Sequence, residues 1–286
     1  MKSILLATDL TNNSDRAMER ALKLAKEQKC PLHLLHVLPQ YRAKRVSTAL
    51  KAATEDMMRG YLKDYKDAAA VKTSVMAVAG SDVHEEILRA AHKVKAGLIV
   101  LGLHGKTKIP DLFAGTTAER LVRKGSVPVL MVKNKPIGAY ANVVCAVDFS
   151  PSSRAALRLA ASLAPQASFY GVHSYEVPVY PFETSYIYLE TKVAVLDEDQ
   201  RRMEKFVLEE SKLAKKKGKA GIRLTGRVVQ GPVYDVLAKQ VKNTKAELIA
   251  MGSHGRVGLM PSLLGSLAGT LLTHPPADVL VVREKA

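Results

Sequence analysis

One spacing of glycine and hydroxyl residues occurs twice in this chain of 286 residues. The motif has two glycines separated by two residues, then nine further residues, a third glycine and a pair that begins with Thr or Ser. The first copy consists of Gly102, Gly105, Gly115, Thr116 and Thr117, and the second of Gly252, Gly255, Gly265, Ser266 and Leu267. Each copy follows an apolar run and precedes a helical pattern. In α/β proteins this place holds phosphate groups, because backbone N–H groups at a helix start favour an anion.

The glycines have a physical reason in such a loop. Gly102 and Gly105 let the backbone turn tightly and approach a ligand, and Gly115 removes a side chain just before the helix. Backbone N–H groups and the hydroxyls of Thr116 and Thr117 then face the anion. The alternative is that the glycines only form turns and that Thr116 is only a helix N-cap. The repeated spacing favours binding, although a shared fold would also preserve turns.

The duplication extends over nearly the whole chain. The stretch SILLATDLTNNSDRAMERALKLA begins at Ser3, and NVVCAVDFSPSSRAALRLAASLA begins at Asn142, so that Asp9 matches Asp148. We therefore predict two domains, residues 1–137 and 138–286, joined by a short linker.

Apolar β-type runs alternate with helical patterns in both halves. Strands are expected at 3–8, 32–38, 73–78, 97–101 and 127–132, and again at 142–147, 168–174, 222–229, 246–251 and 278–282. This order predicts an α/β fold with two tandem doubly wound, Rossmann-like domains, each a five-stranded parallel sheet covered by helices on both sides. Ser150 followed by Pro151 indicates a helix start, and Thr116 with Glu119 indicates a capping box.

The predicted sheet indicates two places for binding: the carboxyl ends of the strands for a ligand, and the last strand of each half for the neighbouring domain. In an open parallel sheet, ligands bind outside the carboxyl ends of the strands where the winding reverses. If the first strand lies beside the fourth, Asp9 meets the Gly102 loop and Asp148 meets the Gly252 loop. The last strand of an isolated half would be an exposed apolar edge. We expect the halves to cover each other's last strands as an internal pseudo-dimer, with a further homodimer left open.

Composition and charge limit the function classes. No apolar run approaches the length of a membrane span and nothing resembles a signal peptide, so the cytoplasm is the expected compartment and no membrane partner is expected. Net charge is +16. The first 137 residues hold 24 Lys and Arg against 13 Asp and Glu, and the remainder holds 19 against 14. The electrostatic field of such a positive net charge attracts polyanions but does not indicate which polyanion binds. Cys30 and Cys145 are expected to be core residues, since they form no short-spaced pair.

These motifs resemble those of the universal stress proteins, specifically the tandem-domain members, over essentially the full chain. The resemblance implies that the motif residues named above hold the ribose and phosphates of ATP. It also implies that Asp9 and Asp148 lie near the ribose and the metal side of the nucleotide, where Mg²⁺ brought by ATP would meet them. In that family, the backbone of a residue at the end of strand two meets adenine. Val37 after His36 matches that position, whereas Ser174 after His173 departs from it.

Further departures distinguish the two halves. The aspartate usual before the fourth strand of this family is Gly97 in one half and Glu247 in the other, a change expected to affect capping more than the pocket. Leu267 follows Ser266 without a capping box. We expect both pockets to form and favour the first as the better nucleotide site.

Histidines invite catalytic interpretations, since His104 and His254 occupy equivalent places in the two loops. A catalytic site would need a nucleophile or base with an orienting partner, and none is evident. We expect loop-structuring roles for these two and strand-end roles for His36 and His173. The leading interpretation is an ATP-binding stress-response sensor or regulator that is not an enzyme beyond weak ATP hydrolysis. The alternative is a basic, non-catalytic scaffold with degenerate nucleotide sites that binds another ligand or an acidic partner. Nucleic acid is not expected, because no aromatic residues alternate with basic ones on a strand.

One aromatic segment, residues 175–188, has no counterpart of equal length in the first half. It holds Tyr175, Tyr180, Phe182, Tyr186 and Tyr188, and its prolines predict a loop through the first part. A lid, an interface anchor and a small satellite core remain open as its role.

Overall fold

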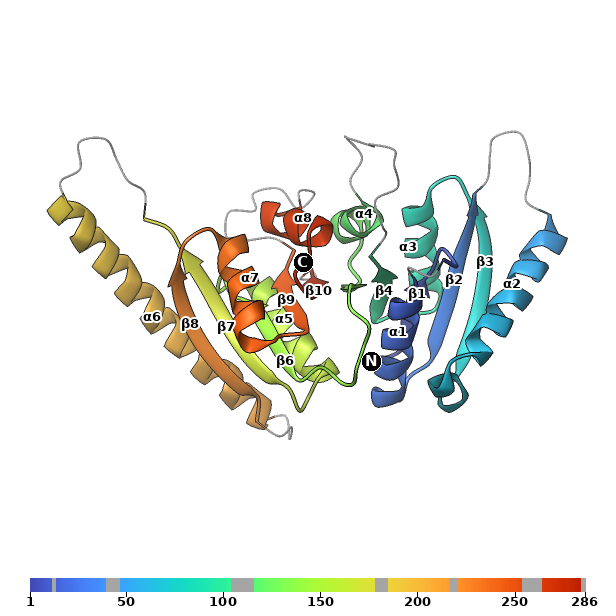
Figure 1. The fold of residues 1–286 in the computed structure, drawn as a ribbon, viewed down its shortest axis with the longest axis horizontal. Helices are drawn as coiled ribbons and strands as arrows, with labels where there is room; N and C mark the ends of the chain where they lie inside the picture. The colour runs from blue at the N-terminus through green and yellow to red at the C-terminus, as the bar shows by residue number, and fades with distance from the viewer. Residues whose placement is uncertain are drawn as a thin grey trace.

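The computed structural model describes residues 1–11, 14–39, 47–103, 116–177, 185–216, 221–253 and 264–283. Its strands form one 10-stranded sheet in the order β3-β2-β1-β4-β5-β10-β9-β6-β7-β8 (Figure 1). The first half contributes β1 (Ile4–Ala7), β2 (Leu32–Pro39), β3 (Thr73–Gly80), β4 (Leu98–Gly102) and β5 (Val129–Val132). The second half contributes β6 (Asn142–Ala146), β7 (Ser168–Tyr175), β8 (Arg223–Gln230), β9 (Leu248–Gly252) and β10 (Asp278–Val282). Every strand lies within two residues of its predicted range, and the predicted α/β fold is confirmed.

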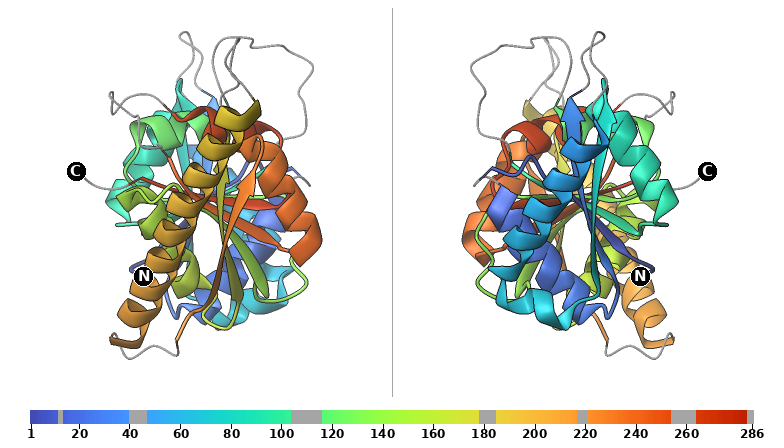
Figure 2. Two further views of the ribbon diagram at one scale, coloured as in Figure 1. Left: turned by 90° about the vertical axis from the view of Figure 1, so that its left-hand side faces the viewer. Right: turned by 90° about the vertical axis from the view of Figure 1, so that its right-hand side faces the viewer.

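Helices connect the strands and cover both faces of the sheet, as the end-on views of Figure 2 show. The first half has α1 (Asp15–Glu27), α2 (Thr48–Lys63), the short 3₁₀ helix η2 (Lys66–Ala70), α3 (Val83–Lys93) and α4 (Thr117–Lys124). The second half has α5 (Pro151–Leu163), α6 (Ser185–Lys216), α7 (Val233–Thr244) and α8 (Ser266–Thr273). No described helix combines the length and apolar character that crossing a bilayer requires.

Two apolar cores lie on opposite faces of the sheet, and each runs through both halves. On one face, side chains of α1, α2, α5 and α6 pack on the strands, with Met18 and Phe206 among the fully buried ones. On the other face, α3, α4, α7 and α8 pack, with Leu121 and Leu271 fully buried. Cys30 and Cys145 are free thiols buried in the first of these cores, and burial raises the pKa of both. They are core residues, as predicted.

The two halves meet through their last strands. Within each half the paired strands run parallel, whereas β10 pairs with β5 in the antiparallel sense, with Val279 opposite Met131 and Val281 opposite Val129. This pairing removes the two apolar strand edges that isolated halves would expose. The predicted internal pseudo-dimer is therefore confirmed.

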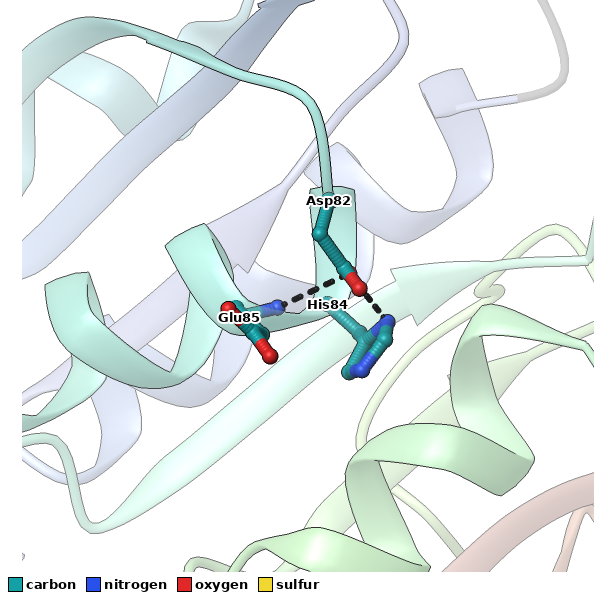
Figure 3. Close-up of side chains that lie close together, drawn as sticks. All are labelled: Asp82, His84 and Glu85. Carbon is teal, nitrogen blue, oxygen red and sulfur yellow. Dashed lines mark hydrogen bonds and ion pairs between the residues drawn. The ribbon is translucent and has the colours of Figure 1, made fainter.

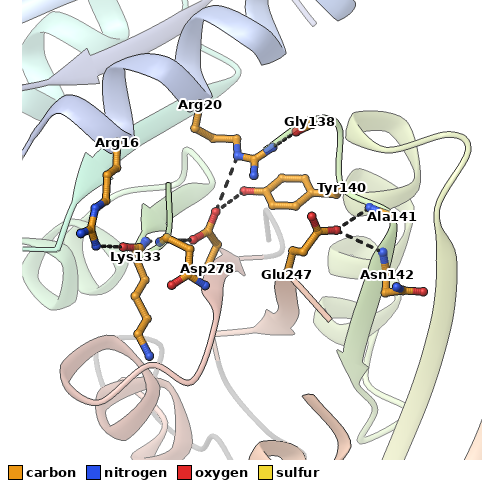
Figure 4. Close-up of polar contacts among 10 residues, drawn as sticks. Arg16, Arg20, Lys133, Gly138, Tyr140, Ala141, Asn142, Glu247 and Asp278 are labelled. Atoms are coloured by element: carbon orange, nitrogen blue, oxygen red, sulfur yellow. Dashed lines mark hydrogen bonds and ion pairs between the residues drawn. The ribbon is translucent and has the colours of Figure 1, made fainter. Parts of the chain in front are cut away.

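A buried polar cluster reinforces this junction (Figure 4). Asp278 accepts hydrogen bonds from the Tyr140 hydroxyl at 2.6 Å and from the backbone N–H groups of Lys133 and Asn134 at 2.9 and 3.1 Å. The guanidinium of Arg20 lies 3.7 Å from the same carboxylate and 3.7 Å from the centre of the Tyr140 ring. Burial raises the pKa of Asp278 and of Tyr140. The cluster joins α1, the linker and β10, and it was not predicted.

Glu247, where the sequence departs from the usual aspartate, lies at a strand start and not at the pocket, in line with the expected effect on capping. Its carboxylate accepts hydrogen bonds from the backbone N–H groups of Ala141 at 2.6 Å and Asn142 at 3.4 Å, just where β6 begins (Figure 4). This contact lies at the amino ends of the strands, far from the carboxyl ends at which ligands bind such sheets.

Candidate functional site

The topology meets the condition for a ligand crevice in each half. β1 lies between β2 and β4, and β6 lies between β7 and β9, so the chain leaves neighbouring strands in opposite winding directions. Asp9 follows β1 by two residues, and Gly102 is the last residue of the adjacent β4. Asp148 and Gly252 have the same relationship on β6 and β9. In each half, the predicted aspartate and the start of the glycine motif therefore lie together at the carboxyl ends of that half's strands.

Asp9 and Asp148 order the turn that follows each first strand. Oδ1 of Asp9 accepts hydrogen bonds from Thr11, through its N–H at 3.0 Å and its hydroxyl at 2.8 Å, and from the Ser14 hydroxyl at 2.6 Å. Oδ1 of Asp148 accepts from the N–H of Ser150 at 3.0 Å and its hydroxyl at 2.6 Å. Both carboxylates are thus fixed by donors from the start of the next helix.

The residue after each aspartate has a left-handed backbone. Leu10 has φ 59° and Phe149 has φ 64°. Neither is Gly, Asn or Asp, the residues that adopt this region readily, so the conformation costs free energy, about 1 kcal/mol or more at each position. Strain repeated at equivalent places is typical of functional turns.

His36 and His173 fix the same turn from the neighbouring strand. Nδ1 of His36 lies 2.9 Å from the carbonyl oxygen of Thr8, and Nδ1 of His173 lies 2.6 Å from that of Val147. A carbonyl only accepts, so Nδ1 is the protonated nitrogen in both rings. These histidines have the strand-end role expected of them.

The two strand-two positions differ in their surroundings. Val37 pairs with Val78 of β3 and packs against the apolar core. Ser174 pairs with Val229 of β8, and its hydroxyl donates to the carbonyl oxygen of Gly231. A side-chain hydrogen bond to the neighbouring turn is therefore present only in the second half.

Thr116 begins α4 as the N-cap of the predicted capping box, which is confirmed. Its hydroxyl accepts from the N–H of Glu119 at 3.2 Å, and the Glu119 carboxylate accepts from the Thr116 N–H. Thr117 is the first helical residue. Helix geometry leaves the N–H groups of Thr117 and Ala118 without intrahelical acceptors.

α8 begins without a side-chain cap. Gly265 is the N-cap, its N–H donates to the carbonyl of Ser253 at 3.0 Å, and Ser266 is the first helical residue. Leu267 packs against the apolar core. The N–H groups of Ser266, Leu267 and Ala268 therefore form the first turn, one donor more than α4 leaves uncapped.

Gly252 has a packing role in addition to any ligand role. A Cβ at this position would collide with Oγ and Cβ of Ser152 and would lie 3.0 Å from the backbone nitrogen of Ser153. Glycine thus allows the start of α5 to approach the end of β9. Such close contact of a helix with a strand is one of the known uses of glycine in nucleotide-binding α/β folds.

Several predicted residues lie outside the described ranges. They are Gly105, Gly115 and Gly255 of the two motifs, His104 and His254, and Tyr180 and Phe182 of the aromatic segment. In that segment, Tyr175 ends β7 as a buried residue, and helix α6 begins at Ser185. The hydroxyl of Tyr188 lies 3.5 Å from Nε2 of Gln230. The three roles considered for the segment remain open.

A polar cluster of His173, Asp199 and Arg202 lies beside the second crevice and was not predicted from the sequence. Nε2 of His173 lies 3.3 Å from Oδ2 of Asp199 on α6, and Arg202 lies 3.5 Å from the same carboxylate. The Arg202 guanidinium also covers the Phe149 ring at 4.5 Å. Asp199 and Arg202 are three residues apart on one helix, a spacing that could have signalled a pair.

A second cluster, Asp82, His84 and Glu85, brings three potential metal ligands together at the start of α3 (Figure 3). Asp82 is the N-cap: it accepts from the Glu85 N–H at 3.4 Å, and its carboxylate also contacts Nδ1 of His84. Lys124 lies 3.7 Å from Glu85, and Lys124 and Arg120 both disfavour a charged His84. Capping accounts for this cluster, and its cationic neighbours disfavour a metal ion.

Comparison with known proteins identifies relatives for both halves. The universal stress protein family matches at residues 1–133 and again at 139–283. A universal stress protein of Methanocaldococcus jannaschii is 30% identical over 145 residues, which cover 46% of this chain and 82% of the relative. Another from the same organism is 26% identical over 159 residues, covering 47% and 96%.

A solved structure covers both halves at once. The crystal structure of a universal stress protein from Archaeoglobus fulgidus aligns with 99% of this chain and 98% of its own, with a TM-score of 0.71 and 22% identity. At that identity the likeness concerns the fold. The predicted boundary between residues 137 and 138 falls in the gap between the two family matches and stays a prediction at that precision.

Proposed function

This chain belongs to the universal stress protein family as a tandem-domain member, and we propose that it binds ATP at the carboxyl edge of each half. In this proposal, nucleotide occupancy alters conformation or partner choice, so that the protein acts as a sensor or regulator in a stress response. The cytoplasm remains the expected compartment.

One observation carries the proposal: each half brings a carboxylate and a glycine-ended strand to adjacent places in one crevice. Asp9 lies beyond β1 next to Gly102 of β4, and Asp148 lies beyond β6 next to Gly252 of β9. The glycine loop leads from there to the start of α4 or α8, where backbone N–H groups favour phosphate. The strained turns and the histidine contacts hold this arrangement alike in both halves.

The aspartates also fit the ion that accompanies ATP. Mg²⁺ prefers oxygen ligands and usually reaches proteins through one or two carboxylates plus substrate phosphates. Asp9 and Asp148 supply that chemistry at the edge where phosphates would bind, and hydroxyl donors orient both carboxylates. When bound, the ion would neutralise phosphate charge.

We propose that the first pocket binds ATP more tightly. Val37 packs among apolar side chains, and such surroundings suit an adenine ring. Ser174, at the equivalent position, instead donates a hydroxyl hydrogen bond to the Gly231 carbonyl. The capping box also fixes the start of α4 before a ligand arrives. In the second pocket, the additional N–H donor of α8 offsets part of this difference.

Binding rather than catalysis is the proposed activity. The two imidazoles nearest the turns, His36 and His173, donate from Nδ1 to main-chain carbonyls and so hold the aspartate turns in place. That role requires no transfer of a proton to or from a ligand. Any hydrolysis of bound ATP would be slow.

Calorimetric titration of three proteins tests the proposal: the wild type, Gly115→Val and Gly265→Val. Each valine places a branched side chain immediately before one helix start and should abolish one of two binding events. The wild type should bind ATP with micromolar affinity, about −8 kcal/mol, in at least one pocket. If the wild type shows no heat of binding with ATP and Mg²⁺, the proposal fails. If both valine variants retain two sites, the sites lie elsewhere.

A further inference from the structure

The amino ends of the first-half strands lie at the lower edge of that half in Figure 1, and an exposed lysine precedes each of four of these strands in the sequence. Lys72, Lys29, Lys2 and Lys95 precede β3, β2, β1 and β4, which are adjacent in this order. The register sets Thr73, Leu32, Ile4 and Leu98 level with one another, and each lysine lies within three residues of that level. Strands lie about 4.8 Å apart, so the row extends over about 14 Å.

These four lysines are exposed, and none forms an ion pair with another residue of the described ranges. Lys26 nearby differs, because it pairs with Asp67 at 2.7 Å. Carboxylates of the described part of the chain therefore leave the charge of the row uncompensated.

Two members of the row have a backbone that lysine does not favour. Lys29 and Lys95 follow the ends of α1 and α3 with φ 48° and 52°. Glycine is the usual residue in this left-handed position after a helix, and a Cβ there costs free energy. Glycine at these two positions would therefore remove the charge and relieve the backbone strain at the same time.

The second half has no such row. Its counterparts, matched through the repeat, are Ala141, Gln166, Arg223 and Lys245. Arg223 lies on the outer β8 and donates to the carbonyl of Gln166, while Lys245 precedes β9. The uncharged Ala141 and Gln166, which precede β6 and β7, lie between the two cationic residues Arg223 and Lys245. The row is specific to the half that carries most of the net charge.

From this juxtaposition we infer that the lysine row binds a linear polyanion whose charges are phosphates, namely inorganic polyphosphate. Four exposed ammonium groups, one before each of four adjacent strands, offer repeated positive charges to a chain of negative ones. Lysine supplies point charges, in contrast to the planar, stacking guanidinium of arginine. No aromatic ring alternates with these lysines, so nothing in the row reads bases. The row lies at the edge opposite Asp9 and Gly102, so the two ligands do not compete for one place.

Calorimetric titration with inorganic polyphosphate of defined chain length, at roughly 50 and 200 mM salt, tests this inference. The double variant Lys29→Gly and Lys95→Gly should weaken binding about tenfold and reduce the slope of log K against log salt by roughly 1.4. Its thermal midpoint should rise by about 2 °C, since glycine favours both positions. A structural role for these lysines would instead lower the midpoint.

Lys245→Gly is the matched control, because Lys245 has φ 51° at the end of α7 but lies outside the row. It should gain stability and keep full affinity. The charge reversal of Lys2 and Lys72 to Glu, which leaves both left-handed positions intact, should abolish binding. The inference fails if the wild type does not bind polyphosphate, if the double variant binds as the wild type does, or if Lys245→Gly weakens binding equally. It also fails if single-stranded poly(U) or phosphatidylserine vesicles bind the row more tightly than polyphosphate.

Discussion

The hydroxyl of Tyr140, in the segment that joins the halves, donates a 2.6 Å hydrogen bond to the carboxylate of Asp278, the first residue of β10. Both side chains are almost completely buried, with 3% and 0% of their residue surface exposed. A buried acceptor that loses its donor keeps the full desolvation cost. This hydrogen bond therefore stabilises the packing of the linker against β10, one strand of the central β5–β10 pair.

Tyr140→Phe should lower the free energy of unfolding by about 1–3 kcal/mol, because one Asp278 oxygen loses its donor inside the protein. Urea unfolding of the full chain measures the loss. Tyr170→Phe is the control, since the Tyr170 hydroxyl makes only a long 3.4 Å contact with Asn142, and it should cost about 0.5 kcal/mol or less. Equal losses in the two variants would contradict a special role for the junction.

Separately expressed halves, residues 1–137 and 138–286, should not behave as stable monomers. In each, the last strand would lose its antiparallel partner and expose a row of backbone donors and acceptors between apolar side chains. We expect self-association through β5 or β10, seen as dimers or larger species by analytical ultracentrifugation. Two monomeric halves with stability equal to that of the full chain would refute the role of the strand pair.

Gly252→Ala should destabilise the second half by about 1–3 kcal/mol, because the new methyl group collides with Ser152 at the start of α5. Thermal unfolding of the full chain measures the effect. Gly138→Ala provides the comparison, since no atom lies within 4 Å of the Cβ it would add. If both alanine variants unfold at the same temperature, β9 and α5 do not pack as described.

His84 should make the stability of the protein depend on pH below neutrality. Burial lowers the pKa of His84 beneath its ordinary value of 6.5, although Asp82 opposes the shift. The unfolded chain therefore binds the proton first, and stability falls as pH decreases through about 6.5 toward the lower folded value. His84→Gln should reduce this acid-side loss, measured as the unfolding free energy between pH 7.5 and pH 5 relative to the wild type. An unchanged pH profile would mean that His84 does not titrate differently in the two states.

Most of the fold could be predicted from local sequence patterns. Strand ranges are predictable because parallel strands covered on both faces form continuous apolar runs, as in residues 98–101 and 279–282. The capping box of Thr116 and Glu119 is predictable because it depends on two residues that are three positions apart in the sequence.

Other features depend on contacts between distant segments and carry no local signal. The left-handed Leu10 and Phe149 have residue types that favour other conformations, so only the folded turn enforces φ 59° and 64°. The Asp278 cluster joins α1, the linker and β10, which are remote in sequence. One signal was available in principle: Asp278 begins an otherwise apolar strand, and an acid that is buried at such a place needs hydrogen-bond donors.

The central claim is that the twin glycine loops serve nucleotide pockets, and analysis of the purified full chain tests it most directly. Denaturation of the protein should release a nucleotide that mass spectrometry identifies as ATP or a close adenine relative, or else the protein freed of ligand should bind ATP with Mg²⁺ in calorimetry, at up to two sites per chain. A protein that releases no nucleotide and shows no ATP binding would contradict the account.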